Sequence, residues 1–204
     1  MTLPHRSSLH PQPPQNLEAA FGGARREGGV EALLSDDSRQ LLAAWKSWRS
    51  KRLLPHRRDM DLVSIARLMP RLVLLEAFSP QRMIFRLAGT EIETVAGLRL
   101  MGRDHIAMAQ PDQRAARSRL LWGAATQPCG ALAFHPISHP DSGRPHQIET
   151  FVLPVLPDDS TAPMQLIGLA AHLPVLEAGS HVTRPLEYAG ARPHFLDIGG
   201  GIPA

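Results

Sequence analysis

The stretch from residue 71 to residue 89 reads RLVLLEAFSPQRMIFRLAG and contains two short apolar runs separated by a turn. RLVLLEAF and RMIFRLAG are each rich in branched and aromatic side chains, and the SPQ between them is typical of a turn. The pattern predicts two antiparallel strands joined by a short connection. Because side chains alternate across a strand, we expect Met83, Phe85 and Leu87 on one face.

Three further strand-like runs follow in the second half of the chain. They are CGALAFHPISH at 129–139, HQIETFVLPVL at 146–156 and MQLIGLAAHL at 164–173. The turn-forming segments DSGRP and PDDSTAP separate them, so we expect three consecutive antiparallel strands. Together with the first pair, these runs predict a five-stranded antiparallel sheet.

An amphipathic helix is expected ahead of the first strand. Ser35 is a good N-cap, and two aspartates follow it, where negative charge favours a helix N-terminus. Leu41, Trp45 and Trp48 then recur at i, i+4 and i+7. Two tryptophans on one stripe bury a large area, so the helix must pack on a sheet or on another chain. We interpret Leu41, Trp45 and Trp48 as a candidate surface for a partner or a second copy.

Further helical segments are expected around the first strand pair. Residues 61–68 fit a short helix, residues 90–97 fit one or two turns, and residues 111–127 fit the longest central helix. The element order is therefore helix, helix, two strands, several helices and three strands. An α+β domain covers this order naturally, with the antiparallel sheet carrying its helices on one face.

Domain boundaries follow from the loss of pattern at both ends. Residues 1–34 are rich in Pro and Gly and predict a flexible N-terminal tail. Residues 35–175 hold every predicted element and form one domain. Residues 176–204, which end in DIGGGIPA, predict a second tail. No output domain is expected after the last strand.

Composition excludes several classes of protein. The 22 Lys and Arg against 19 Asp and Glu give a net charge of only +3, and Cys129 is a single cysteine. One cysteine forms no internal disulfide and no zinc framework, and we expect no metal site. No run is long enough to span a membrane, and the N-terminus lacks the apolar core of a secretory signal. We expect a soluble, cytoplasmic protein.

Several blocks of the sequence resemble the PAS domain superfamily, in particular a subfamily of short, free-standing bacterial PAS proteins. The blocks include Trp45 and Trp48, together with LPHRRDMDLVSIARLMPRLVLLE at 53–76, FRLAGTEIETVAG at 85–97 and ETFVLPV at 149–155. The resemblance covers about residues 35–173. It implies a PAS-like five-stranded antiparallel sheet with strand order 2-1-5-4-3.

Membership of this superfamily implies a cavity between sheet and helices, dimerisation or docking on a signalling partner, and transmission of a signal. The candidate ligand-pocket residues are apolar positions that we expect to contact a small ligand, namely Met83, Phe85, Leu87, Val95, Leu121, Leu132, Phe134, Ile167 and Leu169. A filled core is the alternative at each of them. The cofactor is left unknown. Haem-binding members of the superfamily carry an axial histidine on the long central helix, and residues 111–127 contain none, so haem is not favoured. The aromatic content of 5% argues against flavin, because a flat chromophore is usually stacked by aromatic side chains.

The expected function is that of a sensory or interaction protein in signal transduction, working as a homodimer or by docking on a partner regulator, with gating by a small ligand left open. Two alternatives come from other classes. A nucleic-acid-associated regulator would use the basic cluster at 49–58, although no recognition helix accompanies it. A small α+β enzyme would need a catalytic set, and we assign no catalytic residue.

Overall fold

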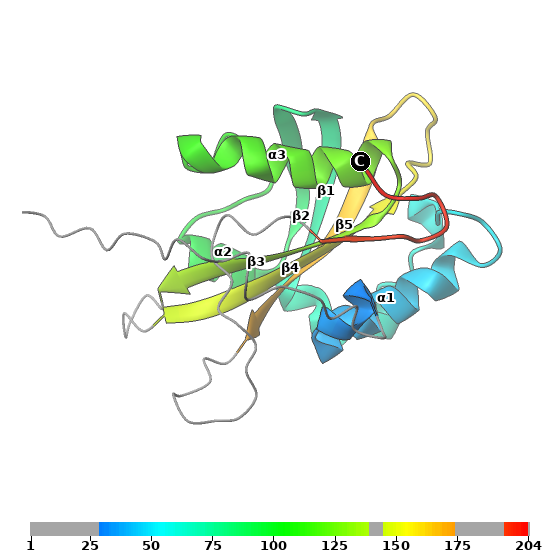
Figure 1. The fold of residues 1–204 in the computed structure, drawn as a ribbon, viewed down its shortest axis with the longest axis horizontal. Coiled ribbons are helices and arrows are strands. Elements are labelled where there is room, and N and C mark those ends of the chain that lie inside the picture. Colours follow the sequence, from blue (N-terminus) through cyan, green and yellow to red (C-terminus); the bar gives the residue numbers. More distant parts are fainter. Residues whose placement is uncertain (1–28, 139–144, 174–193, 204) are drawn as a thin grey trace, which may run out of the picture.

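The computed structural model describes residues 29–138, 145–173 and 194–203, and shows one sheet with helices packed against it (Figure 1). The helices are η1 (Val30–Leu33), α1 (Asp36–Arg49), η2 (Arg57–Asp59), η3 (Val63–Arg71), α2 (Thr90–Ala96) and α3 (Pro111–Thr126). The strands are β1 (Leu72–Ser79), β2 (Arg82–Ala88), β3 (Gly130–Ser138), β4 (Pro145–Val155), β5 (Met164–Leu173) and β6 (His194–Leu196). Every predicted strand and the three predicted helical segments around them are present, although 63–71 forms a 3-10 helix. The DSGRP turn lies mostly outside the described residues.

The sheet order is β2-β1-β5-β4-β3-β6, with antiparallel pairing throughout. The predicted order 2-1-5-4-3 is confirmed, and β6 extends it by one strand at the edge of β3. The expected tail at 176–204 is therefore wrong for residues 194–203, where Leu196 and Ile198 are buried. The sequence pattern does not predict β6, because a strand of three residues is too short to show alternating apolar and polar side chains. Its partner, β3, is also distant in the sequence.

Helices cover both faces of the sheet, which corrects the expectation of helices on one face. Figure 1 shows α1 and α3 on opposite sides of the strands. One apolar cluster joins α1 and η3 to the sheet, with Phe151 and Leu169 at its centre. A second cluster joins α3 to the opposite face through Leu121 and Met83. Leu34, placed in the expected N-terminal tail, is fully buried in the first cluster, while residues 1–28 lie outside the described residues.

A bulge in β2 divides its side chains between these two clusters. Leu74 pairs with Leu87 and the next residue, Leu75, pairs with Phe85, so that Arg86 is the extra residue. Met83 and Phe85 consequently pack on the α3 side, whereas Leu87 packs on the α1 side. The prediction that all three share one face is wrong, because strict alternation cannot anticipate an inserted residue.

Candidate interaction site

The apolar stripe of α1 packs on the sheet of its own chain. Leu41 and Trp45 are 0% exposed and Trp48 is 7% exposed. The indole Nε1 of Trp45 donates a hydrogen bond of 2.8 Å to the carbonyl oxygen of Pro154 on β4. Leu41 and Trp45 therefore belong to the internal core, so the prediction that they form a partner surface is wrong. Trp48 is largely buried as well, but it borders the groove described below.

A buried carboxylate fixes the start of the same helix. Glu149 on β4 is 0% exposed and accepts hydrogen bonds from the backbone N–H of Ser35, at 3.1 and 3.0 Å, and from its hydroxyl, at 2.9 Å. The Ser35 hydroxyl in turn accepts the N–H of Ser38, so the predicted N-cap is confirmed. The sequence did hold a signal for this acid, because Glu149 alternates in phase with the inward-facing Phe151 and Leu153.

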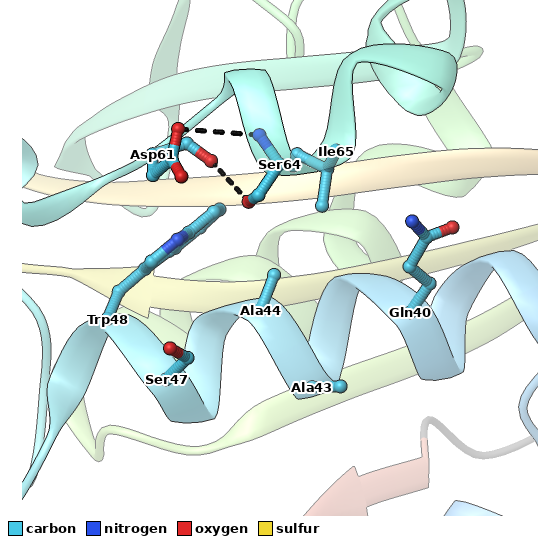
Figure 2. A pocket seen from close by; sticks show the side chains of 8 residues that line it. All are labelled: Gln40, Ala43, Ala44, Ser47, Trp48, Asp61, Ser64 and Ile65. Atoms are coloured by element: carbon cyan, nitrogen blue, oxygen red, sulfur yellow. Dashed lines mark hydrogen bonds between the residues drawn. The ribbon is translucent and has the colours of Figure 1, made fainter.

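A groove of about 330 Å³, open to solvent, lies between α1 and η3. Figure 2 shows Trp48, Ala44 and Gln40 directed from α1 towards the opposite wall, which includes Ser64 and Ile65. The α1 wall of the groove includes the small side chains of Ala43, Ala44 and Ser47. Both walls belong to elements that pack in the fold, since Trp48 of α1 and Ile65 of η3 are buried.

A tight turn beside the groove presents one apolar side chain to solvent. The Asp61 Oδ1 accepts the N–H groups of Val63 at 3.1 Å and Ser64 at 3.3 Å, and the Ser64 hydroxyl donates to the Asp61 carbonyl at 2.7 Å. These bonds fix the turn drawn in Figure 2. Val63 lies in this turn, and 85% of its surface is exposed to solvent. No pattern in the sequence predicts this exposure.

The predicted ligand-pocket residues do not line one cavity. Met83, Phe85 and Leu121 belong to the cluster under α3, and Val95 is 39% exposed on α2. The remaining five lie on the α1 side, namely Leu87, Leu132, Phe134, Ile167 and Leu169. The two sets are therefore separated by the sheet, and most of their members are packed against neighbours.

A small void does lie beside two of these residues. It measures about 10 Å³ and is lined by Leu87 and Ile167, with Met60 and Met69 among the other residues around it. This is the space of one water molecule. The arrangement favours the filled-core alternative at these two positions.

Three of the chemically reactive side chains in the described part of the chain, Cys129, Asp59 and Glu76, are held by burial or by a partner. Burial and the nearby Asp197 carboxylate raise the pKa of the Cys129 thiol to about 11, which keeps it protonated. Hydrogen bonding to the His56 backbone, together with Arg52, lowers the pKa of Asp59. Glu76 pairs with Arg86 at 2.7 Å. These contacts hold the side chains in the fold and leave the non-catalytic expectation as it stood.

Three arginines of the basic cluster at 49–58 make contacts within the chain. Arg49 donates to the carbonyl of Ile198 at 3.0 Å and lies over the Trp45 ring. Arg52 pairs with Asp59 at 2.5 Å, and Arg57 donates to the Met60 sulfur at 3.8 Å. A phosphate-binding surface needs guanidinium groups directed outward together, so this arrangement does not favour the nucleic-acid alternative.

Within the described residues, no three His, Cys, Asp or Glu side chains group as metal ligands do. The helices of that same part of the chain are all too short or too polar to cross a bilayer.

Comparison with known proteins identifies the family. Two solved structures, both variants of RsLOV, are similar in part: one at 17% identity over 56% of this chain and 65% of its own, the other at 14% over 71% of each, both with a TM-score of 0.39. The chain thus spans just under two thirds of the first structure's length. No curated protein matches it. A family model described as PAS domain matches residues 34–171, which is more than half of the chain. The chain belongs to the PAS domain family.

Proposed function

We propose that this chain is a PAS-type interaction protein of a signalling pathway and that it works as a homodimer joined through the groove between α1 and η3. The observation that carries the proposal is the pairing of this groove, about 330 Å³ in volume, with the exposed Val63 beside it. A twofold dimer uses the same surface on both copies, so that surface must contain both a projection and the recess that receives it.

The groove suits the close approach of a second copy. Ala43 and Ser47 leave room for the Val63 side chain of the other copy, and the Trp48 indole offers it an apolar wall. The nearby charges are largely paired within the chain: Arg39 with Asp36 at 2.9 Å, and Arg67 with Asp37 at 3.4 Å. Among the described residues, the Asp61 carboxylate, which lines the groove, has no ion-pair partner but accepts the backbone N–H groups of Val63 and Ser64.

The signal would pass from the dimer to a partner regulator, as the family implies. The dimer surface changes shape if α1 moves on the sheet, because α1 forms one wall of the groove. Ligand gating is not part of the proposal, since the void beside Leu87 and Ile167 has room for about one water.

Sedimentation equilibrium of the full chain over a range of micromolar concentrations tests the dimer. The wild type should have the mass of two chains, and Val63→Asp should have the mass of one, because a charge on the projecting side chain would have to be buried without a partner. Val95→Asp is the matched control, since Val95 is another exposed valine, on α2. It should leave the dimer intact.

Circular dichroism should show both variants to be folded, as each substitution lies at an exposed position. A wild-type protein that is a monomer at every concentration would refute the proposal. Equal dissociation of the Val63→Asp and Val95→Asp proteins would refute the assignment to this groove.

A further inference from the structure

Residues 95–110, which comprise the end of α2 and the connection to α3 (Figure 1), carry half of the exposed large apolar side chains. Eight such side chains are exposed among the described residues, and four of them are Val95, Leu98, Met101 and Met108. Met101 is 69% exposed. Single exposed apolar residues are normal on a protein surface, whereas a concentration of them indicates an interaction site. This stretch is therefore a candidate binding surface.

Hydrogen bonds tie the first part of this stretch to α2. Gly97 takes a left-handed conformation with φ 66°, and its N–H and that of Leu98 donate to carbonyls in the last turns of α2. The Glu93 carboxylate accepts the N–H of Leu100 at 2.9 Å and pairs with Arg99 at 2.9 Å. Leu100 itself is 2% exposed and belongs to the cluster under α3. The exposed side chains thus project from a backbone that is bonded to α2 and anchored in the core.

The next residues of the stretch run beside the edge strand β2. The N–H groups of Gly102 and His105 donate to carbonyls of β2, and the N–H of Phe85 in β2 donates to the Arg103 carbonyl at 3.0 Å. In the sheet order, β2 and β6 are the two outermost strands, five strand spacings or about 24 Å apart. The candidate surface therefore lies at the edge of the sheet opposite β6.

The segments outside the described residues attach to other elements. Residues 139–144 join β3 to β4, residues 174–193 join β5 to β6, and residues 1–28 precede η1, which lies beside β6. None of the three segments begins or ends at β2, α2 or α3. The described chain on both sides of the candidate surface is continuous from η1 to β3.

Three arginines that contact the same stretch have no carboxylate partner. Arg114 of α3 donates to two carbonyls of the stretch, both at 3.0 Å, and Arg117, one turn further along α3, donates to a third at 3.2 Å. Arg103 donates to a fourth at 2.8 Å. Among the described residues, none of the three forms an ion pair. Burial lowers the pKa of Arg117, because its charge is partly withdrawn from water and no carboxylate offsets this.

The acidic groups of the chain do not supply the missing partners. The Asp104 Oδ1 accepts the N–H groups of Met83 at 3.2 Å and Ile106 at 3.0 Å, and Asp112 lies exposed in the first turn of α3. Residues 1–28 contain three Arg against two Glu, and residues 174–193 contain two of each. Neither segment has the acidic excess that three guanidinium groups attract. A carboxylate-rich molecule other than this chain is the complement of the surface.

We propose that residues 95–110, together with Arg114 and Arg117, form a docking surface for a partner segment that carries both carboxylates and apolar side chains. We call it the α2–α3 surface. The carboxylates of the partner pair with the three arginines, and its apolar side chains cover Leu98 and Met101. Methionine suits such a contact, because its flexible side chain adapts to the shape of a partner. The inference names the chemistry of the partner regulator and rests on the proposed signalling role, but not on the dimer.

Two other occupants suit the α2–α3 surface less well. A second copy bound through the same surface would bring arginines against arginines, and like charges in contact cost affinity. A single-stranded nucleic acid is held largely by aromatic side chains on which its bases stack, whereas the four exposed apolar side chains are those of Val, Leu and Met. An acidic and partly apolar peptide satisfies both the charge and the apolar character.

Fluorescence polarisation with the full-length protein tests the proposal. The probe is a fluorescein-labelled peptide in which pairs of Glu alternate with pairs of Leu. It should bind the wild type, and Arg114→Gln/Arg117→Gln should weaken binding about tenfold, because two charge pairs are lost. Arg58→Gln/Arg119→Gln is the matched control, since it also removes two exposed arginines, and Arg119 lies two residues beyond Arg117 on another face of α3. It should keep the wild-type affinity.

The apolar contact is tested separately with a second peptide that has Ser in place of Leu. Met101→Gln should weaken binding of the Leu peptide and leave binding of the Ser peptide unchanged, because only the Leu peptide covers the Met101 side chain. Equal weakening for the two peptides would contradict the apolar half of the proposal.

Three outcomes would overturn the α2–α3 surface as a protein docking site. The first is equal loss of affinity in the two arginine double variants, since net charge alone would then explain binding. The second is a single-stranded oligonucleotide that binds the wild type more tightly than the peptide and is lost in Arg114→Gln/Arg117→Gln. The third is the same result with phosphatidylserine vesicles. Circular dichroism should show every variant folded.

Hydrogen exchange of the wild type keeps the proposal testable if Arg114→Gln/Arg117→Gln fails to fold. The probe should slow exchange of amides within residues 97–110 and leave those of α1 and β6 unchanged; slowing at α1 or β6 alone would contradict the proposal. Val63→Asp should bind the probe as the wild type does, and Arg114→Gln/Arg117→Gln should keep the wild-type mass in sedimentation. Failure of the dimer and failure of the α2–α3 surface are thus distinguishable.

Discussion

Cys129 shows how a single buried residue makes the stability of this protein depend on pH. Its thiol has a pKa of about 11 in the folded protein, raised by burial and by Asp197, against 9.0 in an exposed thiol. Between these values the unfolded chain has released a proton that the folded chain keeps, so the free energy of unfolding falls as pH rises from 9.0 to about 11. The contribution is fully present below pH 9.0 and is on the order of 2 kcal/mol.

Urea unfolding at a series of pH values measures this contribution. The difference in unfolding free energy between the wild type and Cys129→Ala should shrink over the window from 9.0 to about 11, because alanine does not titrate. Other groups that ionise in this range are present in both proteins, so their contributions cancel in the difference between the two unfolding free energies. A constant difference across the window would show that the thiol titrates normally in the fold.

Glu149 is the residue on which the position of the α1 N-terminus depends. Replacing it with alanine leaves the Ser35 N–H without its acceptor, and should cost on the order of 2 kcal/mol in urea unfolding. Glu149→Gln should cost less, because its amide oxygen still accepts one hydrogen bond. The control is Asp158→Ala, whose carboxylate also accepts a backbone N–H, from Arg58, but at the surface. A Glu149→Ala cost no larger than that of the control would contradict this role.

Among the elements, α1 contributes a fully buried tryptophan, Trp45, to the apolar cluster on its face of the sheet. Trp45→Ala should destabilise the protein by about 3–5 kcal/mol, since it removes a fully buried indole and its hydrogen bond to Pro154. Trp45→Phe should cost less, because a ring still fills much of the site. Thermal unfolding followed by circular dichroism gives both values. A stable Trp45→Ala protein would mean that α1 packs only weakly on the sheet.

The elements also show what could be predicted from the sequence. The cap at Ser35, the stripe of α1 and the alternation in the strands are local signals, and each predicted element formed. Arg86, the extra residue of the bulge, depends on register with β1 and leaves no local mark. Val95 was expected inside because α2 was assumed to cover the sheet, yet no residue of α2 is buried. The pairing of β6 with β3 is a long-range contact, as is the apposition of α1 and η3 that makes the groove.

For the molecule as a whole, the sheet separates two apolar cores that should behave independently. Ile167→Val on the α1 side should cost about 1 kcal/mol, and Leu121→Ala on the α3 side about 2–5 kcal/mol. The double variant should lose the sum to within about 0.5 kcal/mol, because the two residues belong to different clusters on opposite faces of the sheet. Urea unfolding measures all three proteins. A coupling well above that margin would show that the faces communicate through the strands.

The placement of the tryptophans gives the molecule an optical property. The chain has three of them: Trp45 and Trp48 lie on α1, and Trp122 lies half-buried on α3. Two of the three indoles are thus shielded from water only while α1 rests on the sheet. Intrinsic fluorescence should accordingly shift to longer wavelength when α1 detaches from the sheet. The natural protein therefore reports this detachment in a cuvette, without an attached dye.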